Sequence, residues 1–220
     1  MDLDVEKINV YHMVHLDRLE TILKSGALFS DLALKDMGIE VGTSITYENI
    51  RSRRREKEVF GIPDLVIGGC VPFYFGTHSP MLYRAMLGKV NGYDYEGGQD
   101  PILYLVFRMI DLIREAEASN LRWFFTDGNA AAALTNQYFD LAELSRLNWN
   151  ILRSSQWAGH RDEKQAEFLV ENRVPLGKSF LGVGVRTQEM RVKVLSVLRN
   201  VGTTIPIVVK DDWYFKGDRA

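Results

Sequence analysis

The stretch 164–171, KQAEFLVE, constrains the fold most, because its side chains alternate between two faces of different character. Ala166, Phe168 and Val170 share one face of an extended chain, and Glu167 lies on the other. This period of two predicts a half-buried β-strand that follows the charged loop 156–164. Two interpretations of Glu167 are open. It is either a charge that protects an edge strand from aggregation or a carboxylate held rigidly beside a cleft.

The composition predicts one domain over residues 1–220. With 46% hydrophobic and 25% charged residues, a chain of 220 residues can bury one substantial core. No apolar run is long enough to cross a bilayer, and the N-terminus is acidic and polar, which predicts a cytoplasmic protein without a membrane anchor. The net charge of -2 argues against nonspecific coating of nucleic acid, but it permits a local basic face.

The order of the expected elements favours an α+β fold. We expect a first strand within 8–16, a helix over 80–87 and a continuous apolar strand within 101–110. An alanine-rich helix is expected over 129–147, and another helix over 188–201 precedes a last strand. Strands and helices are mixed without regular alternation, which fits α+β better than a doubly wound α/β sheet.

Several common chemistries are excluded by their motifs. The segment GVGVRT lacks the third glycine of the dinucleotide fingerprint, and LGKS has Asn172 where a P-loop needs its first glycine. The four histidines form no HExxH motif, the single cysteine Cys70 excludes a disulfide within the chain, and no metal site is expected. Cys70 is interpreted as a small core residue. No G-x-S-x-G segment supports serine hydrolysis.

Polar residues near the ends of expected strands remain as candidates. They are His12, Tyr74, Glu167 and the arginine-rich run RSRRREK at 51–57. Each has a purely structural alternative. A hydrogen-bonded neutral histidine, a tyrosine in the core and a solvated face of a short exposed helix are the common explanations for such residues.

Seven segments, in order along the chain, carry a more specific signal. They are YHMVHLDRLETIL, NIRSRRR, VPFYFGTHSPMLY, GGQDPILYLV, FFTDGNA, KQAEFLV and KDDWYF. In these segments, which cover nearly the whole length, the chain resembles the DarT family of DNA ADP-ribosyltransferase toxins. The resemblance implies an ADP-ribosyltransferase-like split β-sheet core with flanking helices, which binds NAD as co-substrate without a Rossmann motif and without a metal.

The same resemblance implies an activity and partners. The enzyme would transfer ADP-ribose from NAD to a base of single-stranded DNA and release nicotinamide. It would be a monomeric toxin of a toxin-antitoxin system in phage defence, with a macrodomain antitoxin of the DarG kind that removes the modification. Two alternatives stay open, which are a transferase of the same fold that acts on RNA or protein, and a non-catalytic nucleic-acid-binding module.

Residue roles follow from matching positions within the resemblance. The family's catalytic glutamate falls on Glu167, its catalytic arginine on Arg54, and its NAD-contacting histidine on His12, while Tyr74 would line the nicotinamide pocket. These residue types suit the reaction, because cleavage at the ribose builds positive charge that a carboxylate stabilises. Glu167 is also the candidate base that removes the acceptor's proton. Arg54 can hold a phosphate of NAD or DNA bidentately.

The acceptor side is expected to involve Trp157 and His160, in the loop before Glu167, and Asn129. Stacking of a DNA base on Trp157 is a hypothesis that rests on an aromatic residue in a polar loop. Asn129 stands where thymine-modifying relatives have a histidine, and an amide can bond a base edge but cannot shuttle a proton. The target base is therefore left as guanine or thymine. Asn129 could equally be the N-cap of the alanine-rich helix.

Overall fold

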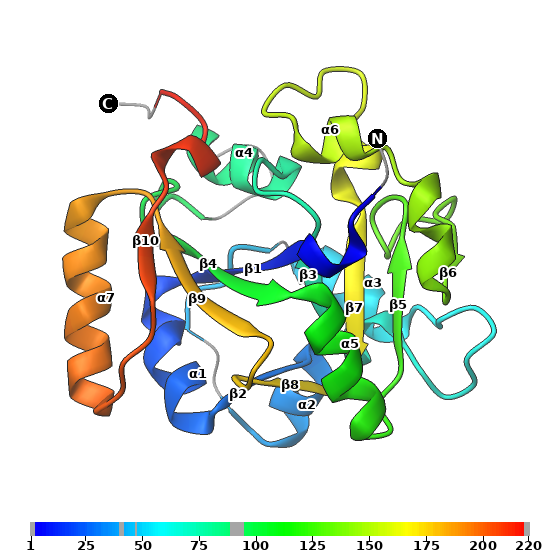
Figure 1. Ribbon diagram of the computed structural model, residues 1–220, viewed down its shortest axis with the longest axis horizontal. Helices are drawn as coiled ribbons and strands as arrows, with labels where there is room; N and C mark the ends of the chain where they lie inside the picture. The colour runs from blue at the N-terminus through cyan, green and yellow to red at the C-terminus, as the bar shows by residue number, and fades with distance from the viewer. Residues whose placement is uncertain (1–2, 40–41, 47, 89–94, 218–220) are drawn as a thin grey trace.

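The computed structural model describes residues 3–39, 42–46, 48–88 and 95–217, and this part of the chain contains ten strands in two sheets (Figure 1). The strands are β1 (Asn9–His15), β2 (Ala27–Phe29), β3 (Cys70–Tyr74), β4 (Ile102–Arg108), β5 (Trp123–Thr126), β6 (Gln137–Tyr138), β7 (Glu167–Glu171), β8 (Arg173–Pro175), β9 (Phe180–Val185) and β10 (Ile207–Val209). The α-helices are α1 (Leu19–Ser25), α2 (Asp31–Asp36), α3 (Glu48–Glu56), α4 (Pro80–Leu87), α5 (Met109–Ala118), α6 (Trp149–Arg153) and α7 (Gln188–Val201). The 3-10 helices are η1 (Val5–Lys7), η2 (Leu16–Arg18), η3 (Ile67–Gly69), η4 (Leu141–Arg146), η5 (Glu163–Gln165) and η6 (Asp211–Trp213).

The large sheet divides into two parts that run in different directions. Its order is β10-β9-β4-β1-β3-β7-β5-β6, and a small second sheet pairs β2 with β8. In Figure 1, β1 and β4 cross the view, whereas β7 and β5 run down it. The pairing explains this split, because β3 meets β1 only at Tyr11 and Tyr74 but pairs with β7 along its whole length. The predicted α+β class with a split sheet is confirmed.

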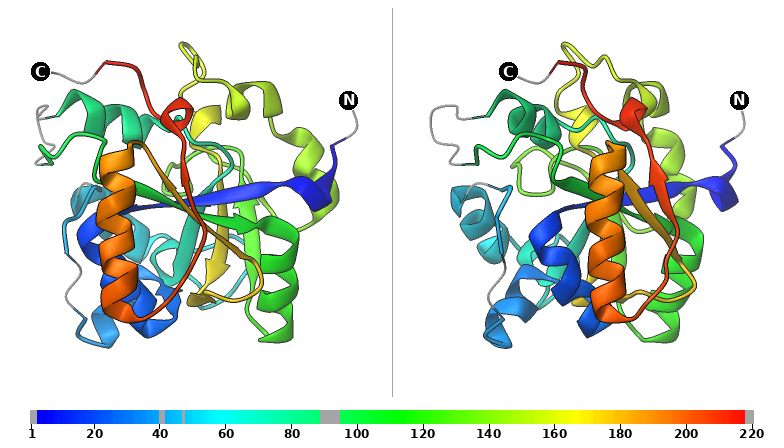
Figure 2. Two further views of the ribbon diagram at one scale, coloured as in Figure 1. Left: turned by 60° about the vertical axis from the view of Figure 1, so that its left-hand side comes forward. Right: turned by 90° about the vertical axis from the view of Figure 1, so that its left-hand side faces the viewer.

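Strand β4 is buried on both faces and separates two clusters of apolar side chains. Leu103, Leu105 and Phe107 pack into the larger cluster, whereas Ile102 and Tyr104 pack into the other. This two-sided burial explains the continuous apolar run that predicted a central strand. The helix over 80–87 and the helix over 188–201 also form as expected. The turned views in Figure 2 show α7 standing along β10, with α1 behind it.

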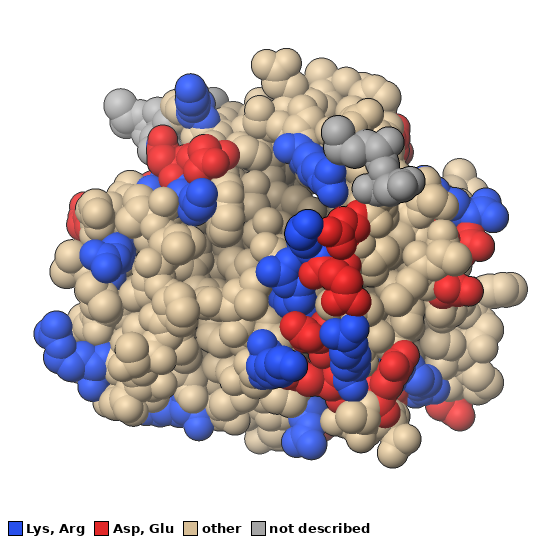
Figure 3. All heavy atoms as spheres, in the orientation of Figure 1, with Lys and Arg blue, Asp and Glu red and all other residues tan. Residues whose placement is uncertain are grey.

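The face of the molecule seen in Figure 3 carries charges of both signs in a central band. Over α5, Arg114 pairs with Glu6 at 3.0 Å and with Asp111 at 3.2 Å. Exposed pairs of this kind add little stability and leave no large field of one sign. Among the described residues, no helix combines the length and apolarity that crossing a lipid bilayer requires.

Strand β7 is not half-buried, and the edge-strand interpretation of Glu167 is wrong. β7 lies between β3 and β5, and its first four residues, from Glu167 to Val170, are all at most 4% exposed. The second face, which holds Leu169, packs into a cluster with Leu65 and Ile67 that the sequence pattern did not reveal. Glu167 is therefore a buried carboxylate in the interior of a sheet.

The alanine-rich helix expected over 129–147 does not form. The segment 127–136 consists of turns and is followed by β6 and the 3-10 helix η4. Short polar side chains compete for the backbone there, since Asn129 Oδ1 accepts from Ala131 N at 2.8 Å and Asp127 Oδ1 accepts from Asn136 N at 3.0 Å. Asn129 thus caps a turn and not a helix.

Helix α3 lies against η3 with almost no space between their backbones. A Cβ atom added to Gly68 would lie 2.8 Å from Arg55 Cα and 3.0 Å from Arg55 N, which are backbone atoms that cannot rotate away. A Cβ atom added to the neighbouring Gly69 would meet only side chains, at 3.7 Å or more. Gly68 therefore sets how closely the arginine-rich helix approaches the sheet.

The substitution Gly68→Ala is expected to lower the free energy of unfolding by about 1–3 kcal/mol, because α3 must shift to admit the methyl group. The matched variant Gly69→Ala should stay within about 1 kcal/mol of the wild type. Urea denaturation of the three proteins provides the measurement. Equal destabilisation by the two alanines would contradict the close approach described above.

Candidate active site

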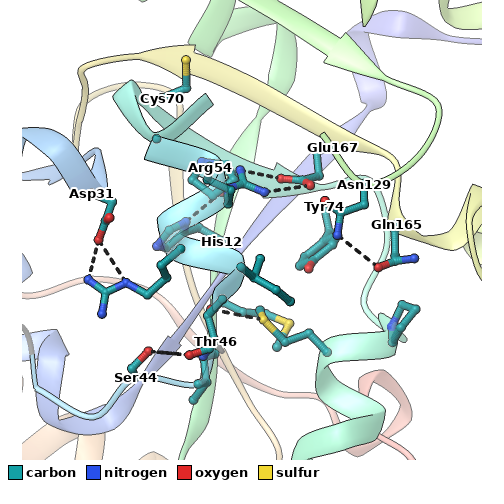
Figure 4. Close-up of a pocket in the computed structure, with 18 of the residues that line it drawn as sticks. His12, Asp31, Ser44, Thr46, Arg54, Cys70, Tyr74, Asn129, Gln165 and Glu167 are labelled. Carbon is teal, nitrogen blue, oxygen red and sulfur yellow. Dashed lines mark hydrogen bonds and ion pairs between the residues drawn. The ribbon is translucent and has the colours of Figure 1, made fainter. Parts of the chain in front are cut away.

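A cavity of about 210 Å³ lies beside the point where β1, β3 and β7 meet, and α3 and α4 form part of its wall. Figure 4 shows that Glu167 and Arg54 point toward each other, with Tyr74 and Asn129 nearby and His12 on the opposite side of Arg54. These five residues, all expected from the sequence to belong to the site, line the same cavity.

Glu167 and Arg54 form a bidentate ion pair. Arg54 Nη1 donates to Glu167 Oε1 at 3.0 Å and Arg54 Nη2 donates to Oε2 at 2.9 Å. The two side chains are only 15% and 5% exposed. Burial alone would lower the pKa of Arg54, but the Glu167 carboxylate outweighs this effect and raises it. Arg54 is therefore a permanent cation whose counter-ion is Glu167.

A backbone amide completes the setting of the carboxylate. Ala130 N donates to Glu167 Oε1 at 3.0 Å, from the turn where a helix was expected. A carboxylate offers about four acceptor positions, and among the described residues three donors reach this one. The open position is on Oε2. Glu167 can accept one further hydrogen bond without giving up any of those it has.

His12 presents one ring nitrogen to the backbone and leaves the other as an acceptor. Its Nδ1 lies 2.8 Å from the carbonyl oxygen of Pro72, so Nδ1 carries the hydrogen and donates it. Burial lowers the pKa of His12 to about 4, which keeps the ring neutral at neutral pH. Neutral Nε2 is then an acceptor on a residue that lines the cavity. His12 therefore has a structural role through Nδ1, which binds the Pro72 carbonyl group, and Nε2 is left for the predicted contact with a ligand.

Asn129 is joined at the cavity by Gln165, which the sequence reasoning missed. Asn129 Nδ2 donates to Gln165 Oε1 at 3.3 Å, so two amide side chains lie side by side (Figure 4). The signal was present, because Gln165 has the same parity as Glu167 in the alternating stretch and so belongs to the same face. Two amides offer both donors and acceptors to a planar ring edge.

Positive charge predominates around the cavity. Among the described residues that line it, five arginines stand against two carboxylates, namely Arg18, Arg51, Arg54, Arg84 and Arg161 against Asp31 and Glu167. Burial and the neighbouring Arg51 lower the pKa of Arg18, so its charge gains from a bound anion. An extended ligand with a diphosphate group matches this distribution.

Asp31 is a second residue that the sequence reasoning missed. Its Oδ1 pairs with Arg51 Nη2 at 2.5 Å and its Oδ2 pairs with Arg55 Nε at 2.5 Å, so the carboxylate of α2 fastens two turns of α3. The interpretation of the arginine run as a solvated face is therefore wrong for Arg51, Arg54 and Arg55. Their charges are used inside the protein and at the cavity.

Trp157 and His160 lie apart from the cavity. Trp157 packs edge-on against Tyr83 and Phe215, with ring centroids 5.9 Å and 6.5 Å away. His160 Nδ1 lies 2.7 Å from Glu163 Oε1, and its side chain is 47% exposed. Two neighbouring residues do line the cavity, namely Arg161 of the same loop and Gln165 of η5. Trp157 and His160 are thus not among the described residues that line the cavity.

Cys70 is a core residue, as expected. Its side chain is buried and burial raises the pKa of its thiol to about 12, so it stays protonated. Among the described residues, no group of three or more His, Cys, Asp or Glu side chains could hold a metal ion.

The lowered pKa of His12 predicts a loss of stability in mild acid. The unfolded chain binds a proton near pH 6.5 but the folded chain only near pH 4, so stability contributed by neutral His12 is lost as the pH falls through this window. The full effect is roughly 3 kcal/mol. Denaturation at pH 7 and pH 4.5 measures how far the free energy of unfolding falls in acid, and this fall should be smaller for His12→Gln than for the wild type. His160→Gln, at an exposed ring, is the matched control, and an equal acid loss in all three proteins would refute the assignment.

Comparisons with known proteins agree with this geometry. The family described as "ssDNA thymidine ADP-ribosyltransferase, DarT" matches residues 11–215. A DNA ADP-ribosyl transferase of Thermus sp. (strain 2.9) is 32% identical over 215 residues, which are 96% of this chain and 97% of the relative. The structure of Thermus sp. 2.9 DarT in complex with ADP-ribosylated ssDNA matches with a TM-score of 0.83 at 31% identity, over 96% of this chain and 97% of the other.

The same Thermus protein in complex with NAD+ gives a TM-score of 0.79 at 30% identity, over 96% of this chain and 98% of the other. The match spans both parts of the split sheet and all the cavity residues discussed above. The motifs quoted from the sequence, the fold and the comparisons agree, and the chain belongs to the DarT family of DNA ADP-ribosyltransferases.

Proposed function

We propose that this protein transfers ADP-ribose from NAD to a base of single-stranded DNA, with Glu167 and Arg54 as its catalytic pair. The observation that carries the proposal is the buried bidentate pair with one open acceptor position on Glu167 Oε2. A carboxylate fixed in this way beside an arginine-lined cavity suits a cationic transition state on a diphosphate-bearing donor. The Thermus relative binds NAD+ and was captured with ADP-ribosylated DNA, which supports the same donor and acceptor here.

The reaction needs little from the protein beyond charge and position. The bond between ribose C1 and the nicotinamide nitrogen breaks, and its electron pair leaves with neutral nicotinamide. The positive charge that develops on the ribose is stabilised by Glu167, whose open position accepts a hydrogen bond from a ribose hydroxyl. An atom of the DNA base then bonds to C1 and loses its proton. The donors of the described residues leave one position of Glu167 open, so the carboxylate serves the hydroxyl and the base proton in turn.

Arg54 acts on Glu167 in this scheme. Two of its five N–H donors bind the carboxylate, so one task of Arg54 is to hold and orient the acid. The three donors that remain can hold a phosphate of NAD or DNA, and Arg18 and Arg51 of the cavity are further candidates for the diphosphate. His12 Nε2 accepts a hydrogen bond from the donor, and Tyr74 covers the nicotinamide ring.

The acceptor base is read by Asn129 and Gln165, with Trp157 and His160 along the incoming strand. The two amides lie within the cavity wall and can match the donor and acceptor pattern of a base edge. Such an edge is exposed only when a base is unstacked, which fits a single-stranded substrate. Guanine and thymine remain the two candidate targets.

The biological setting follows from the family. We propose a toxin of a toxin-antitoxin system in phage defence, countered by a macrodomain antitoxin of the DarG kind that removes ADP-ribose. Location in the cytoplasm would give access to both NAD and DNA. A monomer with a single domain over residues 1–220 is proposed, and one continuous large sheet supports the single domain.

The decisive test is the substitution Glu167→Gln, which keeps the shape of the side chain and removes its charge. We expect transfer to a single-stranded oligonucleotide to fall about 10²–10³-fold or more, because the developing positive charge loses its partner. Mass spectrometry of the oligonucleotide after incubation with NAD measures the product. Oligonucleotides that each lack one of the four bases identify the target.

Glu171→Gln is the matched control. Glu171 ends the same strand and also pairs with an arginine, at 2.5 Å between its Oε1 and Arg122 Nη2. It should retain wild-type transfer. Labelled NAD offered with RNA or with protein tests the alternative acceptors, and binding with steep salt dependence but no nicotinamide release would indicate a non-catalytic module. Equal labelling by the wild type and Glu167→Gln would refute the proposed chemistry.

The proposed stacking on Trp157 has its own test. Trp157→Ala should raise the KM for DNA by about tenfold, since stacking of one base is worth about 1–3 kcal/mol. Trp157→Phe should restore most of the affinity because it keeps an aromatic face. Initial rates at varied oligonucleotide concentration give both values. An unchanged KM in the alanine variant would remove Trp157 from the acceptor site.

A further inference from the structure

Lys164 lies three residues before Glu167 and is buried, and no carboxylate of the described residues pairs with it. Its side chain is 3% exposed, and its Nζ donates to three backbone carbonyl oxygens, those of Ile151 at 3.0 Å, Leu152 at 2.7 Å and Ser154 at 2.6 Å. All three lie at the end of α6 or just beyond it. The ammonium group thus occupies the negative end of a short helix.

A lysine here serves a geometric purpose that an apolar residue could not. Burial lowers the pKa of Lys164 to about 8, which reflects the cost of keeping the charge out of water, and at neutral pH the group remains a cation. Packing alone would favour methionine, which has a similar length and no charge to bury. Three converging carbonyl groups need three donors, and the ammonium group supplies them from one point.

The Lys164 ammonium group lies where three segments of the chain meet. A Cβ atom added to Gly76, just beyond β3, would be 2.1 Å from the Leu152 carbonyl oxygen and 3.6 Å from Lys164 Nζ. The end of β3, the end of α6 and the start of β7 are therefore locked against one another. A second tie lies outside, where Asn148 Nδ2 donates to Glu163 Oε2 at 2.6 Å. Together these contacts join the two ends of the loop 154–163.

The next residue faces the other way. Gln165 follows Lys164 in η5 and lines the cavity, and Arg161 of the same loop lines it too. With Lys164 fixed in the core, the directions of Gln165 and of the loop that carries Trp157 are also fixed. The position of Glu167 is secured independently, by β3, β5 and Arg54.

We propose that Lys164 is the positioning residue for the acceptor side of the reaction, which fixes the loop 154–163 and Gln165 so that a DNA base meets the activated donor in the cavity. The inference rests on the proposed function. It separates the two halves of the site. Lys164 governs how the acceptor is presented, and Arg54 with Glu167 governs cleavage of NAD.

The test compares two activities of Lys164→Met. Transfer to a single-stranded oligonucleotide should fall by about 10²-fold, the scale of effect that a small misplacement of reacting groups produces. Without DNA, water is the acceptor, and the rate of nicotinamide release from NAD should stay within about threefold of the wild-type rate. Lys164→Arg, which keeps a cationic donor, should recover part of the transfer. Lys193→Met, at an exposed lysine of α7, should change neither activity.

Circular dichroism establishes that each variant is folded. If Lys164→Met is unfolded, the test uses Lys164→Gln and Asn148→Ala, which removes the hydrogen bond to Glu163. Both variants should show a higher KM for DNA and an unchanged rate of nicotinamide release. Unchanged transfer, or an equal fall of both activities in a folded variant, would overturn the role of Lys164. A wild-type protein that neither releases nicotinamide nor modifies DNA would instead refute the proposed function itself.

Discussion

The buried ion pair between Arg54 and Glu167 is the interaction on which the site depends. Removing two charges from water costs several kcal/mol for each ion, and only good geometry with further hydrogen bonds offsets this cost. Here the contact is bidentate and Ala130 N adds a third donor. Each partner is also held by the surrounding fold. Helix α3, which carries Arg54, is held by the ion pair with Asp31 and by its close packing on Gly68. Strand β7, which carries Glu167, lies between β3 and β5. The carboxylate is therefore oriented before any substrate arrives.

The parts of the fold that the sequence predicted are those whose signals are local. The strand β4, the helix α4 with its serine cap and terminal glycine, and the helix α7 each carry their pattern within one short stretch. The family resemblance predicted the split sheet, and it also selected Arg54 and Glu167, which the structure brings together at the cavity. Composition and periodicity alone would have left Glu167 as an edge charge, because nothing near it in sequence reveals the cluster that covers its face of β7.

The features that the sequence did not predict depend on partners far along the chain. Arg54 and Glu167 are 113 residues apart, and the exposed-helix interpretation failed for Arg54 because a local pattern does not reveal so distant a partner. The turn at 127–136 replaced a helix because its amide groups are used by Asn129, by Asp127 and by Glu167. The burial of Lys164 could have been predicted from the alternating pattern, because Lys164 is an even number of residues before Phe168 and so belongs to the same apolar face.

That parity also explains how one strand serves both substrates. Around the start of β7, Lys164 points into the core and binds three carbonyl groups, whereas Gln165 and Glu167 line the cavity. Glu167 is held by contacts within the sheet and by Ala130 N, whereas the two ends of the loop 154–163 are joined at Lys164. Because β3, β5 and Arg54 hold Glu167 without the loop 154–163, residues of this loop can change without moving the carboxylate. Under the proposed function, this loop would present the acceptor apart from the carboxylate that acts on the donor, although a single residue, Ala166, separates Gln165 from Glu167.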